Sequence, residues 1–278
     1  LKYQLMNVNM EQNGTRGKWM MRNTTSVQIN YDIASEKDME DMTFVADCLQ
    51  PVSAYLFANS PFQFGKSTGN QNLRNVIWEN TDNPRCRNLI DHDINSQEGL
   101  IDRYIEYIMT VPGIFELNET GMIVDTNQTL GERLIDLETR GELRTEDIQA
   151  ALHQIFTNVR LKHLVEVRGA DRPPQGYEMA PVAFWTGALT SETVRDEILS
   201  VVKNWSVEER HQFNKAALVL DDTQKGPQGK SYREWNQWAG NFALAGLKER
   251  GWREEKFFEE FFETVMKNGP FDLQTQAK

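Results

Sequence analysis

The stretch Leu164-Val165-Glu166-Val167-Arg168 alternates between apolar and charged side chains. Because successive side chains of a strand point to opposite faces of a sheet, this pattern predicts a strand over residues 164–167 that buries its two valines. Glu166 and Arg168 then lie together on the other face and point into the same space. The strand therefore combines a core face with a face that carries a carboxylate beside a guanidinium.

A second strand is predicted over residues 25–31, where Val27 and Ile29 are the apolar positions. On alternation alone, the two strands fit an antiparallel sheet with one solvated face. Asn and Gln are poor strand formers but good hydrogen-bonding groups, so their presence favours a cleft that holds a polar ligand. The polar positions of this strand are Ser26, Gln28 and Asn30.

Helical periodicity dominates the rest of the chain, and few strands among many helices predict an α+β fold. Ser35 is expected to begin a helix that runs to about Leu49, with a break or kink at Pro51 and a second segment to Phe57. Residues 11–18 and 59–70 are predicted loops. Further helices are expected at 72–79, 97–110, 129–139, 146–156, 182–189, 191–204, 207–218, 231–249 and 254–267. We expect one domain over 1–278, with the sheet and the site in 1–180 and a helical part in 181–278.

Composition excludes several classes of protein. The net charge of −11 argues against a broad nucleic-acid surface, which needs a basic footprint. No apolar run is long enough to predict a membrane span. The only two cysteines, Cys48 and Cys86, are too few for a disulfide-stapled secreted domain, so we expect free thiols in a reducing cytoplasm.

The charged face of the 164–167 strand suits an anion site. A carboxylate at Glu166 can bind Mg²⁺, which prefers oxygen ligands, and the guanidinium of Arg168 can hold a phosphoryl group or a carboxylate through two hydrogen bonds. Arg160, Lys162 and Arg172 add positive charge nearby in an otherwise acidic chain. Spacing alone leaves open the alternative of a solvated ion pair with little energetic weight.

The chain contains a series of motifs, which are Met20-Met21-Arg22, Ser26–Asp32, Ser35–Met39, Leu49-Gln50-Pro51, Leu56–Phe62, Arg74, Ile77-Trp78, Thr81-Asp82 with Arg85, Val159–Lys162 and Glu166–Asp171. In this order and at compatible spacing, they resemble the plant and proteobacterial type of glutamate–cysteine ligase from about residue 14 to about residue 250. The resemblance implies the fold shared with glutamine synthetase, in which an antiparallel sheet curves into a bowl with helices packed outside. It also implies phosphorylation of the γ-carboxylate of glutamate by Mg-ATP, followed by attack of the cysteine amine, the first step of glutathione synthesis.

The resemblance assigns expected roles to individual residues. Glu166 would bind Mg²⁺, and Arg168 would be the catalytic residue that contacts the transferring phosphoryl group or the γ-carboxylate. Arg74 and Trp78 would bind the glutamate, with Arg74 pairing its α-carboxylate. Met21 would line the cysteine pocket. The remaining expected site residues are Ser26, Gln28 and Asn30, which would line the bowl around the substrates, and Arg160 and Lys162, which would support the phosphates of ATP.

Two departures from the family pattern shape the expectations. Family members carry acidic metal ligands on strands that precede the Met20-Met21 region, and this chain has no candidate for them. We therefore expect a fragment that lacks roughly the first third of the domain, binds Mg-ATP poorly and is inactive alone. The Asn23–Ser26 segment is one residue longer than in the plant enzymes, so a related ligase with another amine acceptor is an alternative. A non-catalytic helical binding module is a second alternative, and a monomer or a homodimer is expected.

Overall fold

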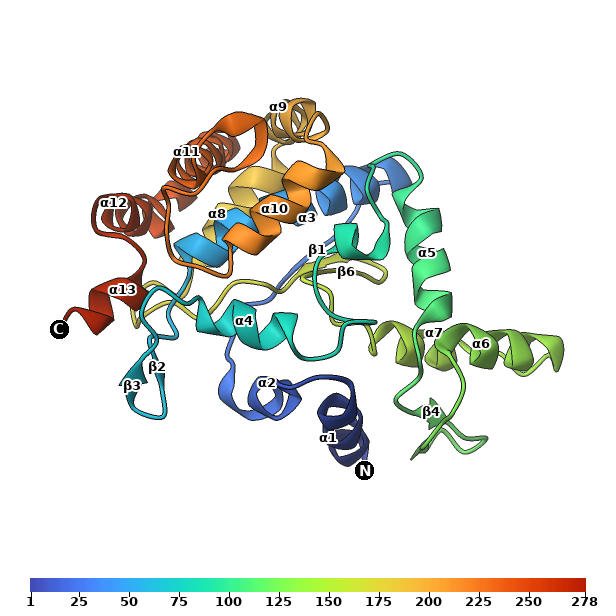
Figure 1. Ribbon diagram of the computed structural model, residues 1–278. Coiled ribbons are helices and arrows are strands. Elements are labelled where there is room, and N and C mark those ends of the chain that lie inside the picture. Colours follow the sequence, from blue (N-terminus) through green and yellow to red (C-terminus); the bar gives the residue numbers. More distant parts are fainter.

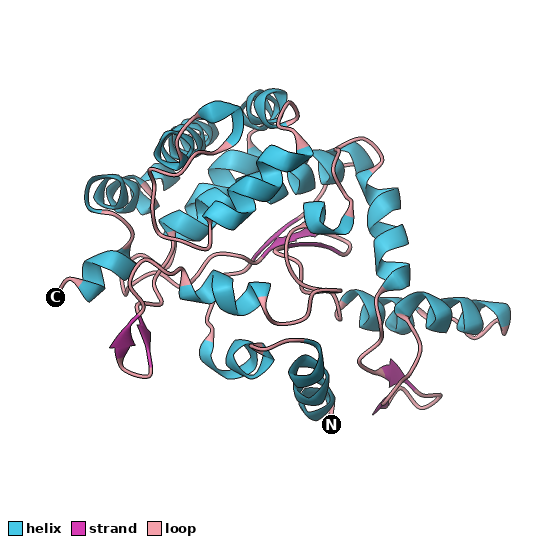
Figure 2. Ribbon diagram, in the orientation of Figure 1, coloured by secondary structure: helices cyan, strands magenta, loops and turns pink.

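The computed structural model describes residues 1–278 and has an α+β architecture in which helices predominate (Figure 2). Its main sheet has three short antiparallel strands, β1 (Ile29–Tyr31), β6 (Val159–Leu161) and β7 (Val165–Val167). The strand order is β1-β7-β6, so β7 is central and the other two strands pair on one side only. The α+β prediction is confirmed.

The register of the sheet separates an apolar face from a charged face. Glu166 lies directly opposite Asn30 of β1 on one side and Arg160 of β6 on the other, which makes one polar row across the three strands. The flanking rows are apolar and buried, and α3 (Glu36–Leu56) packs against β6 and β7. These rows consist of Ile29, Val167 and Val159, and of Tyr31, Val165 and Leu161.

The helix α3 is continuous through Pro51, so the predicted division into two segments is wrong. Its start is as predicted, because the side chain of Ser35 accepts a hydrogen bond of 3.1 Å from the backbone N–H of Asp38. Nearly the whole helix is buried, by the sheet and by helices of the second half. Tertiary packing therefore outweighs the missing backbone N–H of Pro51.

The second half of the chain is helical, as predicted, and forms the layer over α3 (Figure 1). The expected helix over 254–267 begins instead with a 3-10 segment, η3 (Glu254–Phe257), because the backbone at Phe258 departs from helical angles. One hydrophobic core includes residues from Ile29 to Met266. The helices are α8 (Ala180–Thr190), α9 (Glu192–Val202), α10 (Val207–Ala216), α11 (Tyr232–Arg250), α12 (Glu259–Asn268) and α13 (Phe271–Gln276), with a 3-10 turn η2 (Pro227–Gly229).

The first half departs further from the sequence-based expectations. The predicted loop over 11–18 is wrong, because α1 (Lys2–Asn13) and α2 (Gly17–Asn23) leave only three residues between them. The predicted loop over 59–70 contains a hairpin of β2 (Phe62–Gln63) and β3 (Lys66–Ser67). The remaining elements are α4 (Leu73–Glu79), η1 (Leu89–His92), α5 (Leu100–Thr110), the β4 (Glu116–Leu117) and β5 (Ile123–Val124) hairpin, α6 (Leu130–Thr139) and α7 (Thr145–Leu152).

The helices α1 and α2 pack below α4 in Figure 1 around a second, smaller apolar cluster that includes Met6, Met10 and Met20. Both cysteines are buried free thiols, as predicted. None of the helices has the combination of length and apolar composition that crossing a bilayer requires.

Candidate active site

Glu166 sits among three cations on the charged face of the sheet. Its Oε2 lies 2.5 Å from Nε of Arg160 and 3.7 Å from Nε of Arg168, and its Oε1 lies 3.5 Å from Nζ of Lys162. Glu166 and Arg168 are only 5% and 7% exposed. The structure therefore brings the predicted carboxylate and guanidinium together, but in a buried position and not on a solvated surface.

The electrostatics of the group follow from this burial. Burial by itself raises the pKa of Glu166, but the hydrogen bond and charge of Arg160, with the charges of Arg168 and Lys162, outweigh it and leave the pKa lowered. Burial also lowers the pKa of Arg168, to about 10, and the neighbouring Arg160 adds to this effect. One ionised carboxylate thus faces three cations, so the group carries an excess of positive charge.

The indole of Trp78 connects this group to Arg74. The guanidinium carbons of Arg74 and Arg168 lie 5.3 and 5.6 Å from the centroid of the indole ring, within cation–π range. Arg74 donates a hydrogen bond of 3.0 Å from Nη2 to the backbone oxygen of Arg168, and Arg168 donates one of 3.0 Å from Nη1 to Thr157. The helix α4 therefore places two predicted glutamate-binding residues against the end of β7.

Several donors in this stack have no hydrogen-bond partner within the protein. They are Nε and Nη1 of Arg74, Nε of Arg168 and Nε1 of Trp78. Arg74 is 4% exposed, and burial lowers its pKa. A buried donor without a partner is unfavourable, and a charged one more so. An anion with several acceptor oxygens, such as a carboxylate or a phosphoryl group, would satisfy these donors.

The predicted substrate-lining residues of the 25–31 segment are only partly arranged as a strand. The regular strand begins at Ile29, so only Asn30 of the three polar residues lies in it, exposed and directly opposite Glu166. Gln28 instead donates a hydrogen bond of 3.1 Å to the hydroxyl of Ser26. The predicted strand over 25–31 is longer than the observed one. The residues before Ile29 make only one backbone hydrogen bond to the segment after β7, from the N–H of Val27 to the oxygen of Ala170.

Met21 and Arg172 lie apart from the charged group. Met21 is near the end of α2, in a surface hollow with Tyr3 and Val8 of α1. Arg172 pairs at 2.8 Å with Glu178, and both side chains are largely exposed. Arg172 therefore does not contribute to the cation group around Glu166, although the sequence suggested that it would.

The residues present do not form a magnesium site by themselves. No group of three or more His, Cys, Asp or Glu side chains is arranged to hold a metal ion. Glu166 is surrounded by cations and has a hydrogen bond from Arg160 to Oε2, whereas Mg²⁺ requires a set of oxygen ligands. The metal role of Glu166 stays a prediction.

Two residues beside the site were not predicted. The ring of Phe156 lies 5.6 Å from the guanidinium carbon of Arg168. The predicted helix over 146–156 was too long at this end, because α7 ends at Leu152 and Phe156 lies on the segment that follows it. Asp171 is buried near Arg74, and burial raises its pKa against the lowering effect of that arginine. Asp171 belongs to the Glu166–Asp171 motif, so the spacing of that motif was the available signal.

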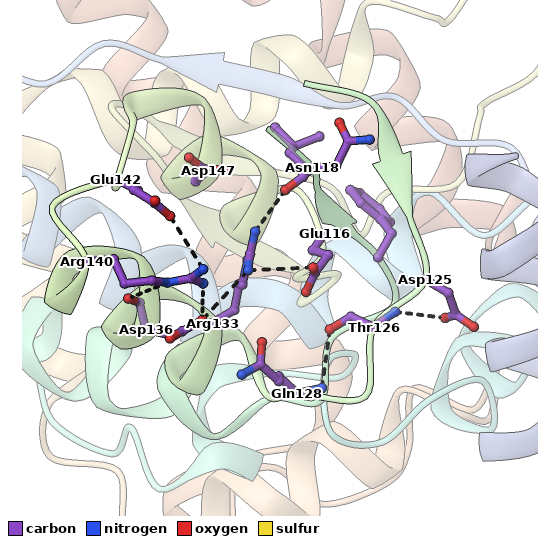
Figure 3. Close-up of polar contacts among 12 residues, drawn as sticks. Glu116, Asn118, Asp125, Thr126, Gln128, Arg133, Asp136, Arg140, Glu142 and Asp147 are labelled. Atoms are coloured by element: carbon purple, nitrogen blue, oxygen red, sulfur yellow. Dashed lines mark hydrogen bonds and ion pairs between the residues drawn. The ribbon is translucent and has the colours of Figure 1, made fainter. Parts of the chain in front are cut away.

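A second group of charged residues lies around the β4–β5 hairpin and α6 (Figure 3). Nη1 of Arg133 lies 3.6 Å from Oε1 of Glu116, and its Nη2 donates a hydrogen bond of 3.0 Å to the backbone oxygen of Leu117. Arg140 pairs with Asp136 and, at 3.5 Å, with Glu142. Because each arginine is matched by carboxylates, this network holds the hairpin to the helix and leaves no free cation for a ligand.

A small antiparallel sheet with a buried, cation-rich polar face, attached to a helical second half, is the arrangement expected of the carboxylate–amine ligases that the sequence resembles. Comparison with known families supports the same class: the model of glutamate-cysteine ligase family 2 (GCS2) matches residues 1–260. The chain belongs to this family.

Individual relatives agree with the family match. The chain is 33% identical over 263 residues to glutamate–cysteine ligase A, chloroplastic, of Oryza sativa subsp. indica. The matched region covers 93% of this chain and 53% of the rice protein. It is 32% identical over 267 residues to the chloroplastic glutamate–cysteine ligases of Medicago truncatula and Arabidopsis thaliana, covering 95% of this chain and 52% and 51% of those proteins. The chain spans about half the length of the curated relatives it matches.

The names of these relatives correct one expectation. All three are named chloroplastic proteins, so the predicted cytoplasmic location is wrong. The cysteine content on which that prediction rested indicates only a reducing environment, which does not distinguish the two compartments.

Proposed function

We propose that this chain takes part in the ATP-dependent joining of glutamate to cysteine, which forms γ-glutamylcysteine for glutathione synthesis, in a plastid. The observation that carries the proposal is the stack of Arg74, Trp78 and Arg168 inside the region that matches the family. Two buried guanidiniums with unpartnered nitrogens suit a substrate that brings carboxylates. Phosphoryl transfer depends on such positioning and charge neutralisation more than on a covalent nucleophile.

The proposed roles are those that the family resemblance implies, and the positions of Arg74 and Arg168 support them. Arg74 pairs with the α-carboxylate of glutamate while its guanidinium lies against the indole of Trp78. Arg168 contacts the γ-carboxylate or the phosphoryl group, where negative charge develops. Arg160 and Lys162, on the same face, support the phosphates of ATP. Met21 lines the cysteine pocket, and Ser26, Gln28 and Asn30 lie along the substrate.

Glu166 is proposed to bind Mg²⁺ together with oxygen ligands that the other residues of this chain do not supply. The sheet is proposed to be one part of a larger curved sheet, because β1 and β6 each have a partner on one side only. Whether the molecule is a monomer or a homodimer stays a prediction.

The test uses a chimeric protein, in which this chain is joined to the part of the rice protein that the match leaves uncovered. The quantity measured is the rate at which this extended protein releases ADP. Release that requires glutamate and is fastest with cysteine, in a panel of amines, is the expected result. Equal rates with every amine would reject cysteine and favour the related ligase, and release that does not depend on glutamate would reject the proposal. Arg74→Lys should weaken the response to glutamate, whereas Lys66→Gln on the exposed β2–β3 hairpin is the matched control.

A further inference from the structure

Two motifs of the family resemblance, Leu56–Phe62 and Glu166–Asp171, meet at a contact to which no role has been assigned. The partly buried Ser60 lies there between two buried carboxyl groups. Its backbone N–H donates a hydrogen bond of 2.9 Å to Oδ2 of Asp272 on α13, and its hydroxyl donates one of 2.5 Å to Oδ2 of Asp171. Ser60 therefore bridges the C-terminal helix to the segment that follows β7.

The hydroxyl of Ser60 makes the shortest hydrogen bond to Asp171. Oδ2 of Asp171 also accepts a bond of 3.2 Å from the backbone N–H of Asn59, and its Oδ1 accepts one of 2.9 Å from the backbone N–H of Arg172. A distance of 2.5 Å between a hydroxyl and a carboxylate is typical of a charge-assisted bond, which is roughly twice as strong as a neutral one. Removal of this hydroxyl would leave Oδ2 with one long bond only.

The other end of the bridge is fixed by α13, which lies beside the β2–β3 hairpin (Figure 1). The backbone N–H of Asp272 donates a hydrogen bond of 3.0 Å to the oxygen of Ala58, and Gln276 donates one of 2.6 Å to Oδ1 of Asp272. The ring of Phe271 stacks on that of Phe261 at a centroid distance of 5.5 Å. These contacts hold the backbone that carries Ser60 in one place.

The segment 168–171 connects this bridge to the proposed glutamate site. It begins at Arg168, whose backbone oxygen accepts the hydrogen bond from Nη2 of Arg74. The other two nitrogens of the Arg74 guanidinium, Nε and Nη1, have no partner, so this bond is its one polar anchor within the protein. Burial lowers the pKa of Arg74, and the negative charge of Asp171 opposes that effect. The position and charge of Arg74 therefore both depend on this segment.

Close packing lets a displacement at one end of the segment reach the other end. A β-carbon on Gly169 would lie only 1.7 Å from Nε2 of Gln50, so the backbone there runs directly against α3. The oxygen of Ala170 accepts a hydrogen bond of 3.3 Å from the backbone N–H of Val27. Packed interiors have low compressibility and transmit strain. A shift of Asp171 is therefore passed on to Arg168 and Arg74.

We propose that Ser60 is a positioning residue of the glutamate site. By bridging Asp272 and Asp171, it holds the 168–171 segment, and with it the guanidinium of Arg74, at the place where the α-carboxylate binds. This role rests on the proposed function, because it concerns the same substrate and the same arginine. Loss of the bridge should weaken the binding of glutamate and leave the reacting groups in place.

The first test is the steady-state kinetics of the extended protein. Ser60→Ala removes the hydroxyl and should raise the KM for glutamate on the order of tenfold, while kcat and the KM for ATP stay within about twofold. The matched control is Ser67→Ala, because the hydroxyl of Ser67 also bonds to α13, at Gln276, but has no contact with Asp171. It should leave all three constants within about twofold. An unchanged KM for glutamate in Ser60→Ala, or an equal loss in all three constants, would overturn the proposal.

A double-mutant cycle tests whether Ser60 acts through Arg74. In a protein that already carries Arg74→Lys, the addition of Ser60→Ala should raise the KM for glutamate by less than about twofold, because the positioned group is gone. A further increase as large as that of Ser60→Ala alone would show that the two residues act independently. That result would overturn the positioning role.

Hydrogen exchange of the 278-residue chain gives a readout that needs no ligase activity. The backbone N–H of Arg168 bonds to the oxygen of Asn158 at 2.8 Å, and that of Arg172 bonds to Asp171. Both should exchange at least about threefold faster in Ser60→Ala, but not in Ser67→Ala. Unchanged exchange would overturn the bridge itself. Faster exchange in a chain whose extended form releases no ADP in response to glutamate would instead overturn the proposed function, and the role of Ser60 in it.

Discussion

Nε of Arg160 lies 2.5 Å from Oε2 of Glu166, and the two residues are direct partners on neighbouring strands. The same carboxylate is the nearest counter-charge of Lys162 and Arg168. One buried anion therefore orders three cations and neutralises only one of them. In the proposed function, the remaining positive charge is preorganised for an anionic substrate, because a site of this kind needs no reorganisation during the reaction.

The first prediction is that Glu166→Gln destabilises the chain. The change leaves buried cations without their counter-charge, and removing one partner of a buried ion pair is typically destabilising by about 3–5 kcal/mol. The measurement is urea-induced unfolding at pH 7. Because the pKa of Glu166 is lowered in the folded state, its contribution is present above the ordinary pKa of a glutamate and is lost as the pH falls through the lowered value.

The control for this prediction is Glu119→Gln, a change at an exposed position in the loop between β4 and β5. It should alter the free energy of unfolding by less than about 0.5 kcal/mol. An equally small effect of Glu166→Gln would contradict the buried arrangement and support the solvated ion pair that the sequence left open.

The second prediction concerns Arg168 in the extended protein described above. Arg168→Lys keeps the charge but loses the planar guanidinium that lies near both Trp78 and Phe156, so kcat should fall on the order of 10²-fold. Arg74→Lys should act mainly on the KM for glutamate, because Arg74 is proposed to bind the substrate and not the reacting group. Arg172→Lys, at an exposed surface pair, should change neither constant. Equal losses in all three variants would indicate misfolding and not the proposed roles.

The helices of the second half could be predicted because their signals are local. An apolar stripe and an N-cap residue mark α9, α10 and α11, whose caps Ser191, Ser206 and Ser231 each accept a backbone hydrogen bond. The strand β6 was not predicted although Val159, Arg160 and Leu161 alternate between apolar and charged side chains, because an alternation of three residues is too short to indicate a strand. The helix α1 was missed because its polar sequence buries only Met6 and Met10 against partners distant in sequence.

The candidate site was predictable only in part, for a related reason. Neighbours two residues apart on a strand, such as Glu166 and Arg168, follow from the geometry of a strand. The position of Trp78 beside Arg168 depends on how α4 packs, which no local pattern indicates. Trp78 was predicted as a site residue only from the resemblance to the ligases. The burial of Glu166 could not be anticipated, because the covering residues come from segments that no local pattern relates to the sheet.

The third prediction is a pH dependence that originates at Asp272, at the start of α13. Its Oδ2 accepts a hydrogen bond of 2.9 Å from the backbone N–H of Ser60, and its Oδ1 accepts one of 2.6 Å from Gln276. Burial nevertheless raises its pKa from 3.8 to about 6, and Asp171 adds to the rise. The carboxyl group of Asp272 therefore binds its proton more tightly in the folded state than in the unfolded state.

The consequence is a free energy of unfolding that falls as the pH rises from about 4 to about 6 and shows no further contribution from Asp272 above that range. Asp272→Asn should remove this component, measured as the difference between the two proteins in urea unfolding at pH 4.5, 5.5 and 7. Asp196→Asn, at an exposed position on α9, should leave the pH dependence of the original chain unchanged. A slope that persists in Asp272→Asn would assign it to Asp171, whose pKa burial also raises.

The last prediction tests the helical layer that supports the site. The helices α8 and α11 approach closely at two glycines: a β-carbon on Gly187 would lie 2.0 Å from the backbone oxygen of Ala243, and one on Gly246 would lie 2.0 Å from that of Gly187. Because both obstacles are backbone atoms, Gly187→Ala must push the helices apart and should be destabilising by about 1–3 kcal/mol or more. The measurement is thermal or urea unfolding. Ala245→Ser, which adds one atom on the exposed side of α11, should have an effect below about 0.5 kcal/mol. If Gly187→Ala had the same free energy of unfolding as the original chain, the close approach of α8 and α11 at this glycine would be contradicted.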